Sequence, residues 1–162
     1  MNNAHSLLIR QMTCEADGIL SLGLVDPEGC ALPAWEPGAH IDLEVPPGAV
    51  RQYSLCGRPE ELGAWRIAVL REQNGTGGSK YVHEALRPGM TVRVPGPCNN
   101  FSLVDSKHYL FIAGGIGIAP ILALESRRAR RRLAAPLRGT SSNLDGVPRR
   151  AVRLRLRRLC GA

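Results

Sequence analysis

The sequence predicts a mainly β protein: an antiparallel Greek-key barrel followed by the first βα unit of an α/β domain. Three observations predict this. Short segments that alternate apolar and polar residues recur through the first hundred residues, as in half-buried strands. Gly- and Pro-rich turns separate them at the short spacing typical of all-β barrels. After residue 107 the pattern changes to a short apolar run, a Gly-rich turn and an apolar helix start.

Six segments are the predicted strands of the barrel. Turn sequences end two of them, Asp26-Pro27-Glu28-Gly29 and Pro95-Gly96-Pro97. One short helix is predicted over 81–86, because Arg87-Pro88-Gly89 would end it. The strands are expected at 6–12, 19–25, 39–45, 51–55, 65–71 and 90–94.

The second unit is predicted from its change of pattern. Residues 108–113 have the composition of a buried parallel strand, and a helix start follows at Pro120. A strand, a Gly-rich turn and a helix form the opening of a nucleotide-binding sheet. We therefore expect a barrel domain over 1–104 and the start of a nucleotide-binding domain over 105–124.

The net charge of +7 is unevenly distributed. Residues 1–124 carry 9 Lys+Arg and 12 Asp+Glu, whereas residues 125–162 carry 12 Arg, no Lys and 2 acids. All seven aromatic residues lie at or before Phe111. Because a GC-rich gene read out of frame yields such a composition, residues 125–162 are expected to be frameshifted and poorly ordered. The alternative is a basic arm that binds nucleic acid or another polyanion, although it lacks aromatic residues for base stacking.

Cysteine spacing and hydropathy limit the function classes. The five cysteines are widely spaced and form no CxxC pair, which disfavours a zinc or iron–sulfur site held by this chain. No apolar run approaches the ~20 residues of a membrane span, and the N-terminus has no signal pattern. We therefore expect a cytoplasmic protein with no metal, no membrane contact and no nucleic-acid partner.

The segment from Arg51 to Leu55 has the residue types that hold a phosphate and a flat heteroaromatic ring. Arg51 can donate two parallel N–H bonds to a phosphate, and Tyr53 can stack on a ring. Ser54 can meet the polar edge of that ring, whereas Gln52 is expected to point to the other face of the strand. Taken alone, an ordinary strand with one exposed Arg is the simpler interpretation.

Two glycine-rich segments add to this pattern. Successive glycines before Ser79 allow consecutive N–H groups to surround an anion, and Ser79 is expected to cap a helix. With Arg51 upstream they predict a phosphate cradle, although a flexible hairpin loop is the alternative. Gly114-Gly115-Ile116-Gly117 would let a pyrophosphate or ribose approach the backbone, but it meets the GxGxxG pattern only in part. A tight βα turn without a ligand is the alternative there.

The order of three motifs in this chain resembles that of the ferredoxin reductase-type flavoprotein superfamily. The motifs are Arg-x-Tyr-Ser-Leu, then Gly-Gly-Ser, then Ala-Gly-Gly-Ile-Gly-Ile-x-Pro-Ile. Within this superfamily, residues 5–124 are most similar to the FMN-containing reductase components of aromatic-ring oxygenases, the phthalate dioxygenase reductase and vanillate demethylase reductase group. Residues 35–42 and 96–101 support the resemblance. It implies an NAD(P)H-dependent flavin oxidoreductase that passes electrons through FMN to a [2Fe–2S] centre and an oxygenase. FAD remains open as the flavin.

The resemblance also implies which residues bind cofactors, with no catalytic side chain among them. One strand would hold the flavin, the next would line it by backbone contacts, the Gly-Gly-Ser segment would take its phosphate, and the second glycine-rich turn would face NADH. These residues are Arg51, Tyr53, Ser54 and Leu55; Ala68, Val69 and Leu70; Gly77, Gly78 and Ser79; and Gly114, Gly115, Ile116, Gly117 and Ala119.

Three departures from the family qualify this expectation. Ala119 replaces a threonine whose hydroxyl contacts the flavin region. After Leu124 the remaining strands of the nucleotide domain are not recognisable, and the four-cysteine cluster of the [2Fe–2S] domain is absent from the sequence. A module that binds flavin but does not oxidise NADH is therefore the alternative function.

Overall fold

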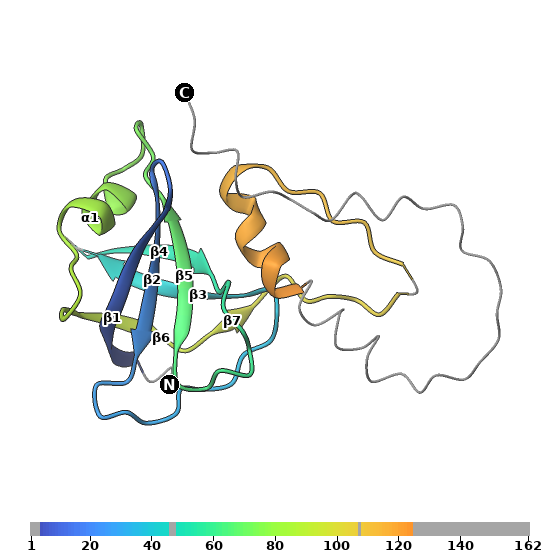
Figure 1. Cartoon of the computed structure of the whole chain (residues 1–162), viewed down its shortest axis with the longest axis horizontal. Helices are drawn as coiled ribbons and strands as arrows, with labels where there is room; N and C mark the ends of the chain where they lie inside the picture. The colour runs from blue at the N-terminus through green and yellow to red at the C-terminus, as the bar shows by residue number, and fades with distance from the viewer. Residues whose placement is uncertain (1–3, 46–47, 107, 125–162) are drawn as a thin grey trace.

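The computed structural model describes residues 4–45, 48–106 and 108–124. These residues form a small β-barrel with the short helix α1, and a second helical segment follows at residues 118–124 (Figure 1). All strand pairs are antiparallel, so the predicted mainly β antiparallel architecture is confirmed. The elements are β1 (Ala4–Ala16), β2 (Ile19–Val25), β3 (Ala39–Val45), β4 (Ala49–Ser54), β5 (Trp65–Leu70), α1 (Gly78–Glu84), β6 (Thr91–Pro95), β7 (Cys98–Asn99) and the 3-10 turn η1 (Gly115–Gly117).

Two sheets make up the barrel. One has the strand order β5-β2-β1-β6 and the other the order β4-β3-β7. Strands distant in sequence are therefore neighbours, since β5 pairs with β2 and β6 pairs with β1. A bridge between Leu55 and Ile67 joins the two sheets just after β4. This bridge brings the end of β4 beside β5, where the cavity described below opens.

The core fills the space between the sheets. In β3 the alternate residues from Ala39 to Val45 are buried, and in β5 Trp65, Ile67 and Val69 are buried. This is the pattern of strands with one face on the core and one toward solvent. Because each buried branched side chain contributes roughly 1.5–3 kcal/mol, this alternation fixes the register of both strands.

A glycine permits the barrel to close between β3 and the segment after β7. Gly38 has a φ of +96°, and a Cβ there would lie 2.0 Å from the Phe101 carbonyl oxygen. Asn99 holds the same junction, since its Nδ2 donates to the Pro37 carbonyl at 3.3 Å and its Oδ1 accepts the Phe101 N–H at 3.1 Å. The chain can pass this point only without a side chain at residue 38.

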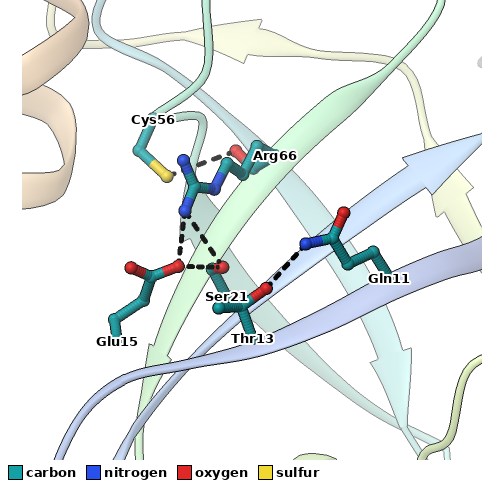
Figure 2. Close-up of polar contacts among 6 residues, drawn as sticks. All are labelled: Gln11, Thr13, Glu15, Ser21, Cys56 and Arg66. Carbon is teal, nitrogen blue, oxygen red and sulfur yellow. Dashed lines mark hydrogen bonds and ion pairs between the residues drawn. The ribbon is translucent and has the colours of Figure 1, made fainter.

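A polar network links three strands on the outer face of the first sheet (Figure 2). Ser21 Oγ on β2 donates to Glu15 Oε1 on β1 at 2.6 Å, and Arg66 Nη2 on β5 donates to both residues. The Ser21 hydrogen bond, followed by Arg66, lowers the pKa of Glu15, although partial burial opposes it. Beside the network, Cys56 Sγ donates to the Arg66 carbonyl at 3.6 Å, and burial raises the pKa of this thiol.

The six predicted strands of the barrel are all present, with ends that differ by a few residues. β2 and β3 have the predicted bounds, and α1 begins at residue 78 instead of residue 81. β7 was not predicted as a separate strand, because its two residues pair only with the start of β3.

The predicted strand over 108–113 is wrong. Residues 108–113 have no strand pairing, and Leu110 and Ile112 are 84% and 83% exposed. A parallel strand needs neighbours to satisfy its backbone and cover its faces, and no described segment lies beside this one as a strand. The predicted helix start is confirmed, since residues 118–124 are helical and Ala123 joins the core.

Two further expectations concern the tail of the chain and the membrane. The frameshifted tail expected over 125–162 lies outside the described residues. Among the described residues, no helix has the length and apolar character needed to cross a bilayer.

Candidate functional site

A cavity of about 330 Å³ lies where β4, β5, the start of α1 and the 3-10 turn meet. In Figure 1 the chain runs out from the barrel after residue 100 and returns, so the helix at 118–124 lies beside the strands. The cavity therefore joins segments that are far apart in sequence. Its wall consists of Arg51, Gln52, Tyr53, Ser54, Ala68, Leu70, Glu72, Thr76, Gly78, Ser79, Ile116, Gly117, Ala119 and Pro120.

Strand β4 contributes the polar side of the wall. Its pairing with β3 places Arg51 opposite Leu43 and Tyr53 opposite Ile41, and both cavity residues are half-buried. Gln52 is exposed between them, as the alternation predicts, but it still forms part of the cavity wall. Ser54 at the strand end is half-buried in the same wall.

Arg51 is held in place by neutral groups. Its Nη1 donates to the Val50 carbonyl at 2.8 Å, and its Nη2 donates to the Thr76 hydroxyl. Its aliphatic stem packs against Gly78, where a Cβ would lie 2.8 Å from Arg51 Cγ and Nε. Within the described part of the chain, Arg51 forms no ion pair with a carboxylate. Its positive charge is therefore fixed at the cavity and not neutralised by direct contact.

Tyr53 presents a neutral phenol to the cavity. Burial raises its pKa above the usual value of 10.0, and Glu72 adds to this effect while Arg51 opposes it. The hydroxyl therefore keeps its proton across the physiological range and can donate a hydrogen bond. Its ring is partly packed against the core, which fixes its plane beside the cavity.

The start of α1 differs from the prediction in one respect. Gly77 is the N-cap residue, with a φ of +94°, and no side chain caps the helix. Ser79 was predicted to be the cap, and this is wrong because the helix already begins at Gly78. The Ser79 hydroxyl instead accepts the Glu72 N–H at 3.1 Å, which ties the end of β5 to the first turn of α1.

Strand alternation separates the predicted lining residues of β5. Ala68 and Leu70 reach the cavity, whereas Val69 between them is fully buried in the core. The Val69 carbonyl accepts a hydrogen bond from His83 Nε2 on α1 at 3.0 Å, so the carbonyl group faces this helix. Leu55 is fully buried beyond the end of β4. Val69 and Leu55 therefore support the wall from behind and do not form part of it.

The second glycine-rich turn reaches the cavity with its later residues. Ile116, Gly117 and Ala119 form part of the wall, whereas Gly114 and Gly115 do not, and neither does Gly77 in the first segment. Gly114 instead closes the turn, since its carbonyl accepts the Gly117 N–H at 3.0 Å. The structure thus brings together ten of the fifteen predicted residues, which come from all four predicted groups.

Four wall residues were not predicted: Gln52, Glu72, Thr76 and Pro120. Thr76 lies inside the Gly75–Ser79 segment, so its hydroxyl in a predicted phosphate loop was a signal that could have been used. Glu72 gave no such signal, because a carboxylate just before a glycine-rich loop is common on protein surfaces. Its place in the wall follows from the turn between β5 and α1.

Several oxygenase reductases are similar to this chain in sequence. The tert-butanol monooxygenase / tert-amyl alcohol desaturase reductase subunit of Aquincola tertiaricarbonis is 43% identical over 128 residues, which span 78% of this chain and 38% of that protein. The vanillate O-demethylase oxidoreductase of Pseudomonas putida is 42% identical, over 71% of this chain and 36% of that protein. The phthalate dioxygenase reductase of Burkholderia cepacia is 42% identical, over 67% of this chain and 34% of that protein.

Solved structures agree with these relatives. A phthalate dioxygenase reductase, described as a modular structure for electron transfer from pyridine nucleotides to [2Fe–2S], matches with a TM-score of 0.76 and 38% identity. That match covers 79% of this chain and 40% of the other. An intact type IV self-sufficient cytochrome P450 monooxygenase matches with a TM-score of 0.77 and 40% identity, over 79% of this chain and 17% of the other.

No protein-family model matches the chain. The chain spans little more than a third of the length of each of the three curated relatives. The motifs, the antiparallel barrel and the relatives named above point to one group. In sequence and fold the chain is similar to the ferredoxin reductase-type flavoproteins, and reductase components of oxygenases are among its relatives.

Proposed function

We propose that the cavity binds FMN, and that the chain acts as the flavin-binding part of an NAD(P)H-dependent oxidoreductase. In this role it would pass electrons to an iron–sulfur centre serving an oxygenase. The observation that carries the proposal is the convergence at one cavity of three features: an Arg with no carboxylate partner among the described residues, a neutral Tyr and two glycine-rich segments. The names of the relatives support the same electron-transfer role.

The residues present fit a flavin monophosphate. Arg51 offers fixed N–H donors to a phosphate, and Gly78 and Ser79 line the cavity beside it. Tyr53, Ala68 and Leu70 offer a largely apolar wall for a ring system, with Ser54 at its polar edge. FMN is preferred to FAD because Phe101, the one aromatic residue of 96–102, is 55% exposed and lies outside the cavity wall.

The chain's own contribution to the reaction is binding and orientation. A bound flavin would supply acceptance of a hydride and release of single electrons. Arg51 and the Gly-Gly-Ser segment would fix the phosphate end, and β4 and β5 would orient the ring. Ile116 and Gly117 would lie where a nicotinamide approaches. We accordingly propose that residues 1–104 are the flavin domain and that residues 105–124 begin the NAD(P)H-binding domain.

Reconstitution tests this function. The full 162-residue chain is titrated with FMN and, separately, with FAD, and binding is followed by flavin absorbance and fluorescence. We expect one FMN per chain, a weaker complex with FAD, and a loss of FMN affinity of roughly a hundredfold in Arg51→Gln, since a charged hydrogen-bond donor is lost. A chain that binds neither flavin would overturn the proposal.

A flavin-binding module without NADH oxidation is the second candidate. The exposure of Leu110 and Ile112 favours it, because a complete nucleotide-binding sheet buries its strands on both faces. Stoichiometric NADH added anaerobically to the FMN-loaded chain decides between the two. Rapid bleaching of the flavin supports the oxidoreductase, whereas bound flavin that stays oxidised supports the module.

A further inference from the structure

The loop between β5 and α1 reaches across the cavity to Arg51. Thr76 lies 25 residues from Arg51 in sequence, and its hydroxyl accepts a hydrogen bond from Arg51 Nη2. The Val50 carbonyl accepts from Nη1 on the other side of the guanidinium. These are the hydrogen bonds of Arg51 within the described residues, and they use two of the five N–H groups of a guanidinium.

The chemistry of the acceptor at residue 76 matters. A carboxylate at this position would pair with Arg51 and cancel its positive charge. The negative carboxylate would also repel an anionic ligand. A hydroxyl accepts the hydrogen bond without adding charge, so Arg51 is fixed in place and remains fully cationic. The same hydroxyl keeps its own O–H, which can donate to an anion held by Arg51.

Gly78 closes the other side of this arrangement. A Cβ at residue 78 would lie 2.8 Å from Arg51 Cγ and 2.8 Å from Nε, so the side chain of Arg51 lies directly over the glycine backbone. Arg51 is thus confined between Thr76 and Gly78, which both line the cavity. A long flexible side chain that is confined before binding loses less conformational entropy when the ligand arrives.

We propose that Thr76 is a positioning residue for Arg51 and determines the affinity of the cavity for the 5′-phosphate of a flavin. This inference rests on the proposed function and adds to it a residue that recognises the phosphate. Thr76 holds the guanidinium toward the cavity, and the neutral hydroxyl preserves the positive charge. The ring of the flavin takes no part in this contact.

The experiment compares two ligands that differ only in the phosphate. Full-length wild type, Thr76→Val, Thr76→Ser and Thr76→Asp are each titrated with FMN and with riboflavin, and flavin fluorescence gives the dissociation constants. Thr91→Val is the matched control, because Thr91 is an exposed threonine on β6 outside the cavity wall. Thermal unfolding of each variant verifies that it is folded.

We expect Thr76→Val to weaken FMN binding about tenfold and to leave riboflavin binding unchanged. Thr76→Ser restores the affinity for FMN, and Thr76→Asp weakens FMN binding more than Thr76→Val does. Equal weakening of FMN and riboflavin in Thr76→Val would overturn the positioning role while the proposed function stands. Wild type that binds neither flavin would overturn the proposed function, and this inference with it.

Discussion

At the scale of single residues, the site depends on how one arginine is confined. Arg51 has two neutral hydrogen-bond acceptors and a glycine under its stem. A guanidinium in this setting keeps its positive charge and has a restricted conformation. An anion-binding site needs both properties. The residues around Arg51 therefore matter as much as Arg51 itself.

Gly78→Ala tests the close packing under Arg51. The new methyl group would lie 2.8 Å from Arg51 Cγ, so the side chain must move away from its place at the cavity. We expect FMN affinity to fall about tenfold while riboflavin affinity is unchanged, as measured by fluorescence titration. Gly63→Ala is the control, because nothing lies within 4 Å of a Cβ there. A Gly78→Ala variant with full FMN affinity would contradict the confinement of Arg51.

Tyr53 gives a prediction about alkaline pH. Burial raises its pKa above 10.0, so the folded chain keeps this proton at a pH where the unfolded chain has lost it. Ionisation of Tyr53 should therefore not affect the free energy of unfolding below pH 10. The free energy of unfolding should decrease as the pH rises from 10 through the pKa of Tyr53 in the folded chain. Denaturant unfolding at a series of alkaline pH values measures this decrease. The decrease should be smaller in Tyr53→Phe; identical slopes in the two proteins would refute the assignment.

Residue types in sequence order predicted much of this site, and the limits of that prediction have a physical cause. Arg51, Tyr53 and Ser79 were identified because charge, ring and hydroxyl indicate a ligand chemistry. Leu55 and Val69 were placed at the cofactor, Val69 through its backbone, and strand alternation turns the side chains of both into the core. Thr76 was missed because its role depends on a contact with a residue 25 positions away.

At the scale of elements, the first sheet is linked by the network of Glu15, Ser21 and Arg66 shown in Figure 2. The pKa of Glu15 is lowered from its usual 4.5, so its contribution is present above pH 4.5 and is lost as the pH falls through the folded pKa. Because Glu15 and Arg66 are partly exposed, solvent screening limits this contribution to about 1 kcal/mol.

Glu15→Gln measures that contribution. We expect the free energy of unfolding to fall by up to about 1 kcal/mol at neutral pH, and the difference from wild type to disappear in acid. Urea unfolding at both pH values gives the two differences. Glu61→Gln is the control, since Glu61 and Arg58 form a highly exposed pair at 3.6 Å that should contribute little. A Glu15→Gln effect that persists unchanged in acid would exclude the ionised network as its cause.

Barrel closure depends on Gly38, and a pair of substitutions separates its two constraints. Gly38→Ala imposes both a positive φ and a clash with the Phe101 carbonyl, whereas Gly29→Ala imposes only the positive φ, of 79°. We expect a loss of about 1–2 kcal/mol in Gly29→Ala and of at least about 3 kcal/mol in Gly38→Ala. Midpoints of urea unfolding measure both. Equal losses would show that the clash is relieved by movement of the segment after β7.

Elements were predicted well where one face is buried. β3 follows from alternation because buried side chains alternate with partly or fully exposed ones along the whole strand. β7 has two residues and no periodicity to detect. Residues 108–113 have the composition of a buried strand, but composition does not supply the neighbouring strands that such a segment needs.

At the scale of the whole molecule, the segment after the barrel has exposed apolar side chains. Val104, Leu110 and Ile112 are each at least 80% exposed, and Leu122 on the following helix is 41% exposed. Extended apolar segments with unpaired backbone groups promote association between chains. The exposed segment therefore predicts a tendency of the chain to self-associate.

Paired substitutions test this tendency. We expect the double variant Leu110→Lys, Ile112→Lys to shift the full chain toward the monomer in analytical ultracentrifugation, because charge at these positions opposes pairing of extended segments. Leu62→Lys, at a residue 45% exposed on the barrel, is the control and should leave the distribution unchanged. If the wild-type chain is already monomeric at high concentration, the segment does not mediate association.

The central claim is that segments distant in sequence form one flavin site, and an amide spectrum of the isotope-labelled full chain titrated with FMN tests it most directly. We predict shifts that saturate at one FMN per chain and concentrate at residues 51–54, 68–70, 76–79 and 116–119, with β1 and β6 little changed. The same titration in Arg51→Gln should require far more FMN. Shifts confined to another surface, or a spectrum that FMN leaves unchanged, would contradict the account.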